Sequence, residues 1–218
     1  MQIMFEDRHL IVLVKPAGVS SEETQPGGMD SVPNMIRAHL ENEKAYVGVV
    51  HRLDAGVSGV MVYAKTPKAA AALSQQVQDG RFRKEYLCLC AGIPEPCEGE
   101  MRDYLFKDSR QGKVFPVKKE RKGAKEALLD YCVLDTSVLQ DADKTEIALC
   151  RIQLRTGRTH QIRVQFASRK HPLLGDGKYG SRVKGAIALR CTKITFVHPA
   201  DGKEMEFSAN APEEWLLR

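Results

Sequence analysis

Short apolar runs separated by polar turns pattern the first third of this chain. Residues 9–14 are mostly apolar and rich in branched side chains, and the tetrapeptide KPAG ends the run. Residues 45–50 and 57–64 form two further runs, which the polar sequence HRLDAG separates. Runs of this length, bounded by glycine, proline and polar residues, predict β-strands. We therefore expect three strands here, with a polar loop held between two of them.

Two helices are predicted from their capping residues. The first covers residues 31–41, with Asp30 or Ser31 as its N-cap and a proline in its first turn. The second follows the Thr-Pro pair at 66–67 and is closed by Gly80.

The rest of the chain is again rich in predicted strands. They cover residues 84–91, 128–134, 146–154 and 187–197. A third helix of about three turns is expected from Thr159. Strands arrive in runs with helices between some of them, which favours an α+β fold with a mixed, mostly antiparallel sheet. No shift in composition marks a linker, so we expect one domain over residues 1–218.

Composition narrows the class of protein. Hydrophobic residues make up 43% of the 218 positions and charged residues 28%, which excludes a disordered or fibrous chain. We find neither a bilayer-crossing apolar stretch nor a secretory signal at the start, so we expect a cytoplasmic protein without membrane contact. The six cysteines lack the spacing of a zinc site, and we expect no metal.

Positive charge is concentrated in one segment, which we call the basic arm (residues 107–125). It holds eight basic and two acidic residues in a chain of net charge +5. Such a run is either a solvated loop or a phosphate-binding arm. The candidate phosphate contacts are Lys118, Lys119, Arg121 and Lys122.

Three polar segments could carry chemistry. Asp54 lies in the loop HRLDAG, where it could be a reactive carboxylate or a turn aspartate. Arg158, His160 and Arg163 surround the start of the third helix, as a basic solvated face or as partners of a buried carboxylate. The glycine-rich sequence at 171–180 is either a fixed functional loop or a structural turn.

Taken together, these segments resemble the RluA-type family of RNA pseudouridine synthases. The matching motifs are FEDRHLIVLVKPAG (5–18), HRLDAGVSG (51–59), KEYLCLCAG (84–92), TGRTHQIR (156–163), HPLLGDGKYG (171–180) and FVHPADGKEMEFSANAP (196–212). The resemblance runs over nearly the whole chain, with the motifs in family order. It implies one pseudouridine-synthase-like domain with helices flanking the sheet and a central active-site cleft.

The resemblance also implies an activity and its residues. Members of this family convert uridine in RNA to pseudouridine without a cofactor. The family's catalytic aspartate falls on Asp54, its paired arginine on Arg163 and its base-stacking tyrosine on Tyr86. The arginine that helps displace the target nucleotide falls on Arg52. His51, Arg158 and His160 are further candidates for RNA contact.

We therefore expect a stand-alone enzyme without an S4 domain, acting on structured ribosomal or transfer RNA. A monomer with no obligate protein partner is the default. One alternative is a catalytically silent RNA-binding protein on the same fold. Another is a glycosidase, which needs two carboxylates, and Asp176 is the candidate for the second.

Overall fold

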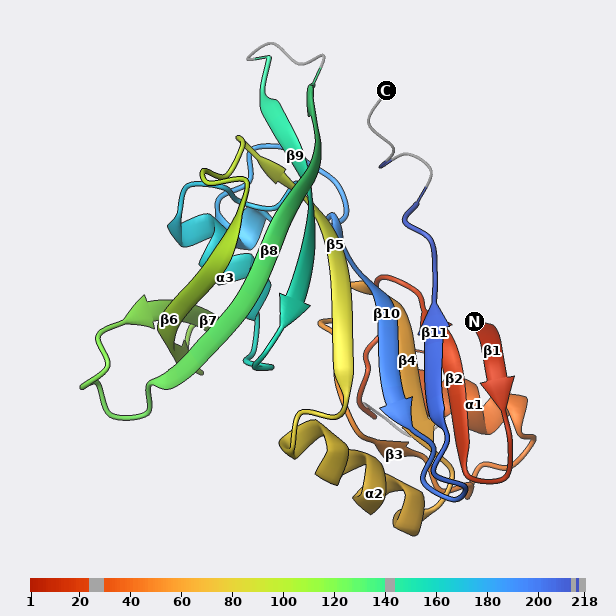
Figure 1. Ribbon diagram of the computed structural model, residues 1–218. Helices are drawn as coiled ribbons and strands as arrows, with labels where there is room; N and C mark the ends of the chain where they lie inside the picture. The colour runs from red at the N-terminus through yellow and green to blue at the C-terminus, as the bar shows by residue number, and fades with distance from the viewer. Residues whose placement is uncertain (24–29, 140–143, 213–214, 216–218) are drawn as a thin grey trace. The chain divides into compact units, whose positions relative to one another are not determined.

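A computed structural model describes residues 1–23, 30–139, 144–212 and 215 (Figure 1). The chain forms two compact units. Unit 1 comprises residues 1–84 and 190–210, and unit 2 comprises residues 85–189 and 211–218. The expectation of one domain over the whole chain stays a prediction. Among the described residues, no helix has both the length and the apolar character needed to span a bilayer.

Unit 1 is built on a mixed sheet. Its strands are β1 (Gln2–Glu6), β2 (Leu10–Lys15), β3 (Gly48–Val49), β4 (Ser58–Ala64), β10 (Leu189–Val197) and β11 (Glu204–Ser208). The order is β1-β2-β4-β10, with β3 beside β4 and β11 beside β10. The β4–β10 pair is parallel, whereas the other pairs in this unit are antiparallel.

The core of unit 1 sits on its central strands. Leu10 to Leu13 of β2 and Val60 to Ala64 of β4 are completely buried. Strands covered on both faces carry continuous apolar runs rather than alternating ones, which explains the runs seen in the sequence. Gly59, the second residue of β4, has a φ of +138°, and a Cβ there would collide with the carbonyl oxygen of Cys191 on β10. Only glycine permits this close approach of the two strands.

Two helices complete unit 1, each with the cap that its sequence predicts. Helix α1 (Val32–His39) begins after Ser31, whose side chain accepts a hydrogen bond from a backbone N–H of the first turn. Helix α2 (Pro67–Gln78) begins after Thr66 in the same way. The Gln76 amide exchanges two hydrogen bonds of 2.7 Å with the backbone of Val197, which docks α2 on β10.

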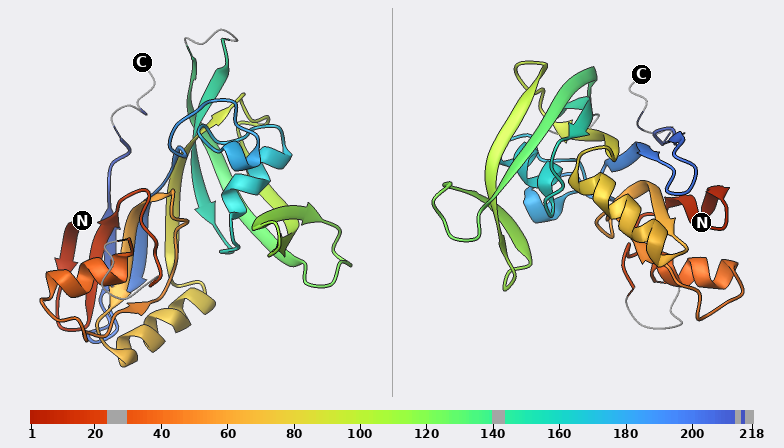
Figure 2. Two further views of the ribbon diagram at one scale, coloured as in Figure 1. Left: turned by 180° about the vertical axis from the view of Figure 1, so that it is seen from behind. Right: turned by 60° about the horizontal axis from the view of Figure 1, so that its bottom comes forward.

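Unit 2 is an antiparallel sheet with one helix. Its strands are β5 (Arg83–Ala91), β6 (Glu98–Asp108), β7 (Lys113–Val117), β8 (Lys125–Val138) and β9 (Glu146–Leu154), in the order β5-β9-β8-β6-β7. The first two residues of β5 belong to unit 1. Helix α3 (Gln161–Ser168) lies against β6 and β7 (Figure 2), and a short 3-10 helix, η1 (Gly177–Tyr179), follows it.

The α+β class and the mixed, mostly antiparallel pairing are confirmed. Four details of the prediction are wrong. Residues 45–50 form only the two-residue strand β3. Helix α3 has eight residues, just over two turns, and its cap is His160 instead of Thr159. The strands β1, β6, β7 and β11 were not predicted, because their sequences mix charged and apolar residues without a sustained apolar run. The basic arm is not a single loop, because β6 ends at Asp108, β7 covers Lys113–Val117 and β8 begins at Lys125.

Candidate active site

Asp54 lies in a loop of unit 1 whose backbone is held at several points. Its carbonyl oxygen accepts the N–H of Val57 at 2.9 Å, which closes a turn just before β4. The next carbonyl, that of Ala55, accepts the N–H of Gly18 at 2.8 Å. On the other side, the Ser21 hydroxyl donates to the carbonyl of Leu53 at 2.7 Å. The half-buried Asp54 side chain is therefore presented by a backbone of defined geometry.

Lys15 is the residue of this loop that sequence reasoning missed. It ends strand β2 with an exposed fraction of 0%, and its Nζ donates to the carbonyls of Pro16, Val19 and Ala55 at 2.6–3.0 Å. Burial lowers the pKa of Lys15 to about 8, and the negative charge of Asp54 opposes that shift. One buried ammonium thus joins the β2 turn to the Asp54 loop and places a positive charge near the carboxylate. A lysine directly at the end of an apolar run was the signal in the sequence.

His51 and Arg52, just before Asp54, occupy contrasting environments. His51 is 5% exposed, its Nε2 accepts the N–H of Val62 at 3.1 Å, and its ring packs on Phe82. Burial, followed by the charge of Lys84, lowers the pKa of His51 well below its usual value. The neutral ring therefore braces the loop against β4, and its expected contact with RNA stays a prediction. Arg52 is exposed and pairs with Glu22 at 2.9 Å.

Arg163 of unit 2 forms a buried two-point ion pair. Its Nε and Nη2 donate to the two carboxylate oxygens of Asp176 at 2.6 and 2.8 Å. The two residues are 6% and 1% exposed. Such a fork fixes the plane of the guanidinium group as well as its position. The expected pairing of Arg163 with Asp54, which belongs to unit 1, stays a prediction.

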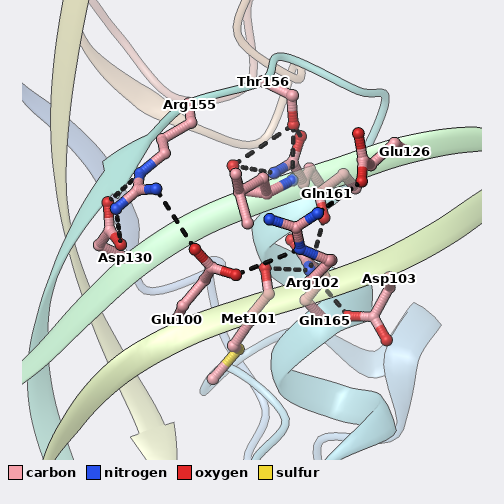
Figure 3. Close-up of polar contacts among 12 residues, drawn as sticks. Glu100, Met101, Arg102, Asp103, Glu126, Asp130, Arg155, Thr156, Gln161 and Gln165 are labelled. Carbon is pink, nitrogen blue, oxygen red and sulfur yellow. Dashed lines mark hydrogen bonds and ion pairs between the residues drawn. The ribbon is translucent and has the colours of Figure 1, made fainter.

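Glutamine side chains fasten α3 to the sheet (Figure 3). Gln161 donates to the carbonyl of Leu128 on β8 at 3.1 Å and accepts the Thr156 hydroxyl at 2.8 Å. One turn later, Gln165 donates to the carbonyl of Met101 on β6 at 3.1 Å. Residues four apart lie on one helix face, so this face is tied to the sheet while Arg163 points elsewhere.

The remaining site residues of unit 2 are placed as follows. Tyr86 is buried on β5, opposite Ile152 of β9, as expected for a tyrosine inside a strand. Arg158 is exposed, and its Nε donates to the carbonyl of Glu126 at 2.7 Å. His160 caps α3 in a left-handed conformation, with no capping hydrogen bond from its side chain. Contact of each with RNA stays a prediction.

A ladder of ion pairs crosses the same sheet (Figure 3). Arg102 binds Glu100 and Glu126 at 3.2 and 3.0 Å. Arg155 binds Glu100 and Asp130 at 3.3 and 2.7 Å. Each of these two exposed arginines is thus paired with two carboxylates of β6 and β8.

The basic arm presents its cations differently. Its four candidate residues, 118, 119, 121 and 122, are exposed on the loop between β7 and β8. The Lys119 ammonium lies 5.9 Å from the ring centre of Tyr104, and the Arg121 guanidinium lies 4.0 Å from that of Phe106. Cation–π contacts of this kind hold a charge at the surface without neutralising it. Two of the four cations thus make cation–π contacts with aromatic rings. These contacts distinguish this loop from a freely solvated one.

Comparison with known proteins identifies the family. A model of the family described as RNA pseudouridylate synthase matches residues 9–168 of this chain. The chain belongs to that family. The RNA pseudouridylate synthase match includes Asp54, Tyr86 and Arg163, whereas Asp176 follows it.

Several relatives support membership in the RNA pseudouridylate synthase family. The Escherichia coli (strain K12) protein named dual-specificity RNA pseudouridine synthase RluA is 32% identical over 219 residues, covering 96% of this chain and 92% of that protein. The Bacillus subtilis (strain 168) protein YhcT, named as an uncharacterized RNA pseudouridine synthase, is 32% identical over 204 residues. That match covers 91% of this chain and 65% of YhcT, so the chain spans about two thirds of that relative.

A solved structure supports the RNA pseudouridylate synthase fold independently. Human RNA Pseudouridylate Synthase Domain Containing 1 has a TM-score of 0.79 at 21% identity, covering 97% of this chain and 83% of that chain. The resemblance to RluA-type enzymes noted in the sequence is therefore confirmed for family and fold.

Proposed function

We propose that this chain isomerises uridine to pseudouridine within structured RNA, with the Asp54 carboxylate as its catalytic group and no cofactor. The observation that carries the proposal is the position of Asp54. It lies in a loop whose carbonyls are held by Lys15 and Ser21, within a chain that belongs to the RNA pseudouridylate synthase family. A reactive group on a rigidly held loop is what catalysis at a fixed geometry requires.

The reaction needs a carboxylate and a way to retain the detached base. The bond between N1 of uracil and C1′ of ribose breaks, the uracil turns, and its C5 joins C1′; C5 then loses its proton, and N1 gains one. An ionised Asp54 can attack C1′, attack C6 of the uracil, or remove the 2′ proton to give a glycal. We assign Arg163 to keep Asp54 ionised through its positive charge, and Tyr86 to stack on the uracil.

The target nucleotide must leave its stack before it can react. We assign Arg52 to this step. Its ion pair with Glu22 joins two side chains that are 59% and 55% exposed, and a pair so exposed contributes little to stability. Arg52 can therefore exchange Glu22 for RNA at small cost.

The alternative of a two-carboxylate glycosidase is disfavoured by the state of Asp176. Both of its carboxylate oxygens accept hydrogen bonds from Arg163. A proton on this carboxyl would displace one of those bonds, so Asp176 is poorly suited to be the general acid that such hydrolysis requires.

Ribosomal and transfer RNA are both proposed as substrate classes. One relative, from Zymomonas mobilis, is named ribosomal large subunit pseudouridine synthase D and is 31% identical over 234 residues. A cytoplasmic location, a monomeric state and the lack of an obligate protein partner belong to the same proposal. Pseudouridine mapping of total RNA with and without the gene tests the proposed isomerisation. We expect at least one uridine to lose its modification, and an unchanged map would overturn the proposal.

Tyr86 provides a test of the stacking role. We expect Tyr86→Phe to retain much of the isomerisation rate because the ring remains, and Tyr86→Ala to retain little. Single-turnover release of tritium from 5-tritiated uridine in RNA measures both. Equal inactivity of the two variants would show that the hydroxyl has a chemical role, for example in proton transfer at C5.

The basic arm provides a test of phosphate binding. We expect the arm variant, in which Lys118, Lys119, Arg121 and Lys122 are all changed to Gln, to bind RNA more weakly. The slope of log affinity against log salt should flatten by about 0.7–0.9 for each phosphate that the variant no longer binds. The rate of isomerisation on bound RNA should persist, since none of the four lies in the matched motifs.

A control variant separates this effect from the general loss of charge. Lys44, Lys68, Lys170 and Lys184 are exposed positions outside the arm and outside the matched motifs, and their change to Gln removes the same charge. We expect this control to keep a steeper slope than the arm variant does. Identical slopes for the two variants would mean that the arm is an ordinary solvated loop.

A further inference from the structure

Tyr179 joins three parts of unit 2 that act in the proposed reaction. Its hydroxyl oxygen accepts the backbone N–H of Val114 on β7 at 3.0 Å and lies 2.8 Å from Nδ1 of His160. Its ring lies 5.1 Å from the guanidinium carbon of Arg163 and 5.4 Å from the ammonium of Lys113. One side chain thus contacts the basic arm, the N-terminal cap of α3 and the buried arginine.

The loop that carries Tyr179 has a fixed shape. Gly175 has a φ of +75°, and a Cβ there would lie 2.0 Å from the carbonyl oxygen of Ala186, so only glycine fits. The carbonyl of Asp176 then accepts the N–H groups of Tyr179 and Ser181 at 3.0 and 3.1 Å. The loop therefore places the Asp176 carboxylate against the edge of the Arg163 guanidinium. It places the Tyr179 ring near the same guanidinium from a second direction.

His160 supports the same arrangement from the start of α3. Its φ of +50° lies in the left-handed region, which residues with a side chain rarely adopt. Its ring contacts the Tyr179 ring edge to face, at 5.6 Å between centres. A strained conformation of this kind persists where the surroundings hold it, and the bond to Tyr179 is part of that support.

We propose that Tyr179 is a positioning residue that couples the basic arm to Arg163. This inference rests on the proposed function. The hydroxyl ties β7, and with it the arm, to the start of α3. The ring restricts the movement of the Arg163 guanidinium through a cation–π contact. The two parts of the side chain therefore serve different steps. The hydroxyl supports RNA binding, and the ring supports the chemical step.

Two substitutions separate these parts. Tyr179→Phe keeps the ring and removes the hydroxyl with its bonds to Val114 and His160, and we expect RNA affinity to fall about five- to tenfold, with kcat nearly unchanged. Tyr179→Leu removes the ring as well, and we expect kcat to fall about tenfold in addition. Tyr46→Phe, at a tyrosine of unit 1 that is 44% exposed, serves as the control and should change neither quantity.

A double-variant cycle tests the coupling itself. If the hydroxyl acts through the arm, Tyr179→Phe should lower RNA affinity in the native background and have little further effect in the arm variant. Its salt slope should likewise move towards that of the arm variant. A merely structural role would lower affinity equally in both backgrounds, and that result would overturn the proposal.

The readouts distinguish failure of this inference from failure of the proposed function. Affinity is measured with an unmodified tRNA transcript and needs no turnover, while kcat uses the RNA identified by the mapping experiment. Absence of turnover in the unaltered protein would overturn the proposed function. Full turnover in the unaltered protein, together with unchanged affinity in Tyr179→Phe or unchanged kcat in Tyr179→Leu, would overturn the role of Tyr179 alone.

Discussion

Asp54→Asn is expected to abolish isomerisation while leaving RNA binding largely intact. Asparagine is nearly the same size as aspartate but carries no charge and is a poor nucleophile. The turn around Asp54 depends on its backbone carbonyl, which accepts the N–H of Val57 and is present in the variant. We expect the single-turnover rate to fall by more than roughly 10³-fold, as when an enzyme loses its nucleophile.

Tritium release measures this loss, and a salt titration of RNA affinity on the same protein measures binding. Asp135→Asn is a matched control, because Asp135 is exposed on β8 of the other unit. It should keep full activity. Mass spectrometry of the purified Asp54 variant excludes its conversion back to aspartate. Substantial turnover by a verified variant would remove Asp54 from the catalytic role.

Arg163→Ala is expected to lose most of the activity, and more than Arg158→Ala does. Arg163 is buried and held in a fixed plane by Asp176, whereas Arg158 is exposed on the loop before α3. A preorganised cation near a reacting carboxylate commonly contributes about 10²-fold or more to the rate. An exposed arginine that contacts RNA backbone should chiefly affect affinity. We therefore expect Arg163→Ala to lower kcat and Arg158→Ala to raise KM.

The free energy of unfolding of the Arg163 variants has to be measured together with their rate of isomerisation. Arg163→Ala leaves the Asp176 carboxylate buried without its guanidinium, and breaking such a pair commonly costs about 3–5 kcal/mol of the free energy of unfolding. Urea unfolding followed by circular dichroism gives the folded fraction at the assay temperature. Arg163→Lys keeps a positive charge but cannot form the fork, so it reports on geometry. Equal losses of kcat in the folded Arg163→Ala and Arg158→Ala proteins would mean that the two arginines have been assigned wrongly.

The sequence pattern predicted those strands and helices whose formation depends on residues close to one another in the chain. The apolar runs of β2 and β4 predicted buried strands, because strands covered on both faces need apolar side chains at every position. Ser31 and Thr66 predicted the starts of α1 and α2, since a capping side chain bonds an N–H only a few residues away. The motif HRLDAG drew attention to Asp54, and the resemblance to the family, rather than the local pattern, assigned it the catalytic role.

The strands of the basic arm could not be found in this way. β6 carries charged residues along its length, and the short β7 begins with Lys113 and contains Pro116. An edge strand tolerates proline because one side of it needs no N–H partner. Residues of the arm pair across the β6–β7 hairpin, and β6 pairs in turn with β8. Their strand character therefore depends on neighbours rather than on an apolar run.

The sequence by itself determined the α+β class, the family and the candidate Asp54. Only the tertiary structure decided how the charges within each unit are held. Lys15 donates to the carbonyl of Ala55, 40 positions away, and Arg163 forks with Asp176, 13 positions away. Tyr179 reaches Val114 across 65 positions. Periodicity and capping act over a few residues, whereas burial of a charge is tolerated only where folding brings a partner to it, so these contacts follow from the packing of the whole unit.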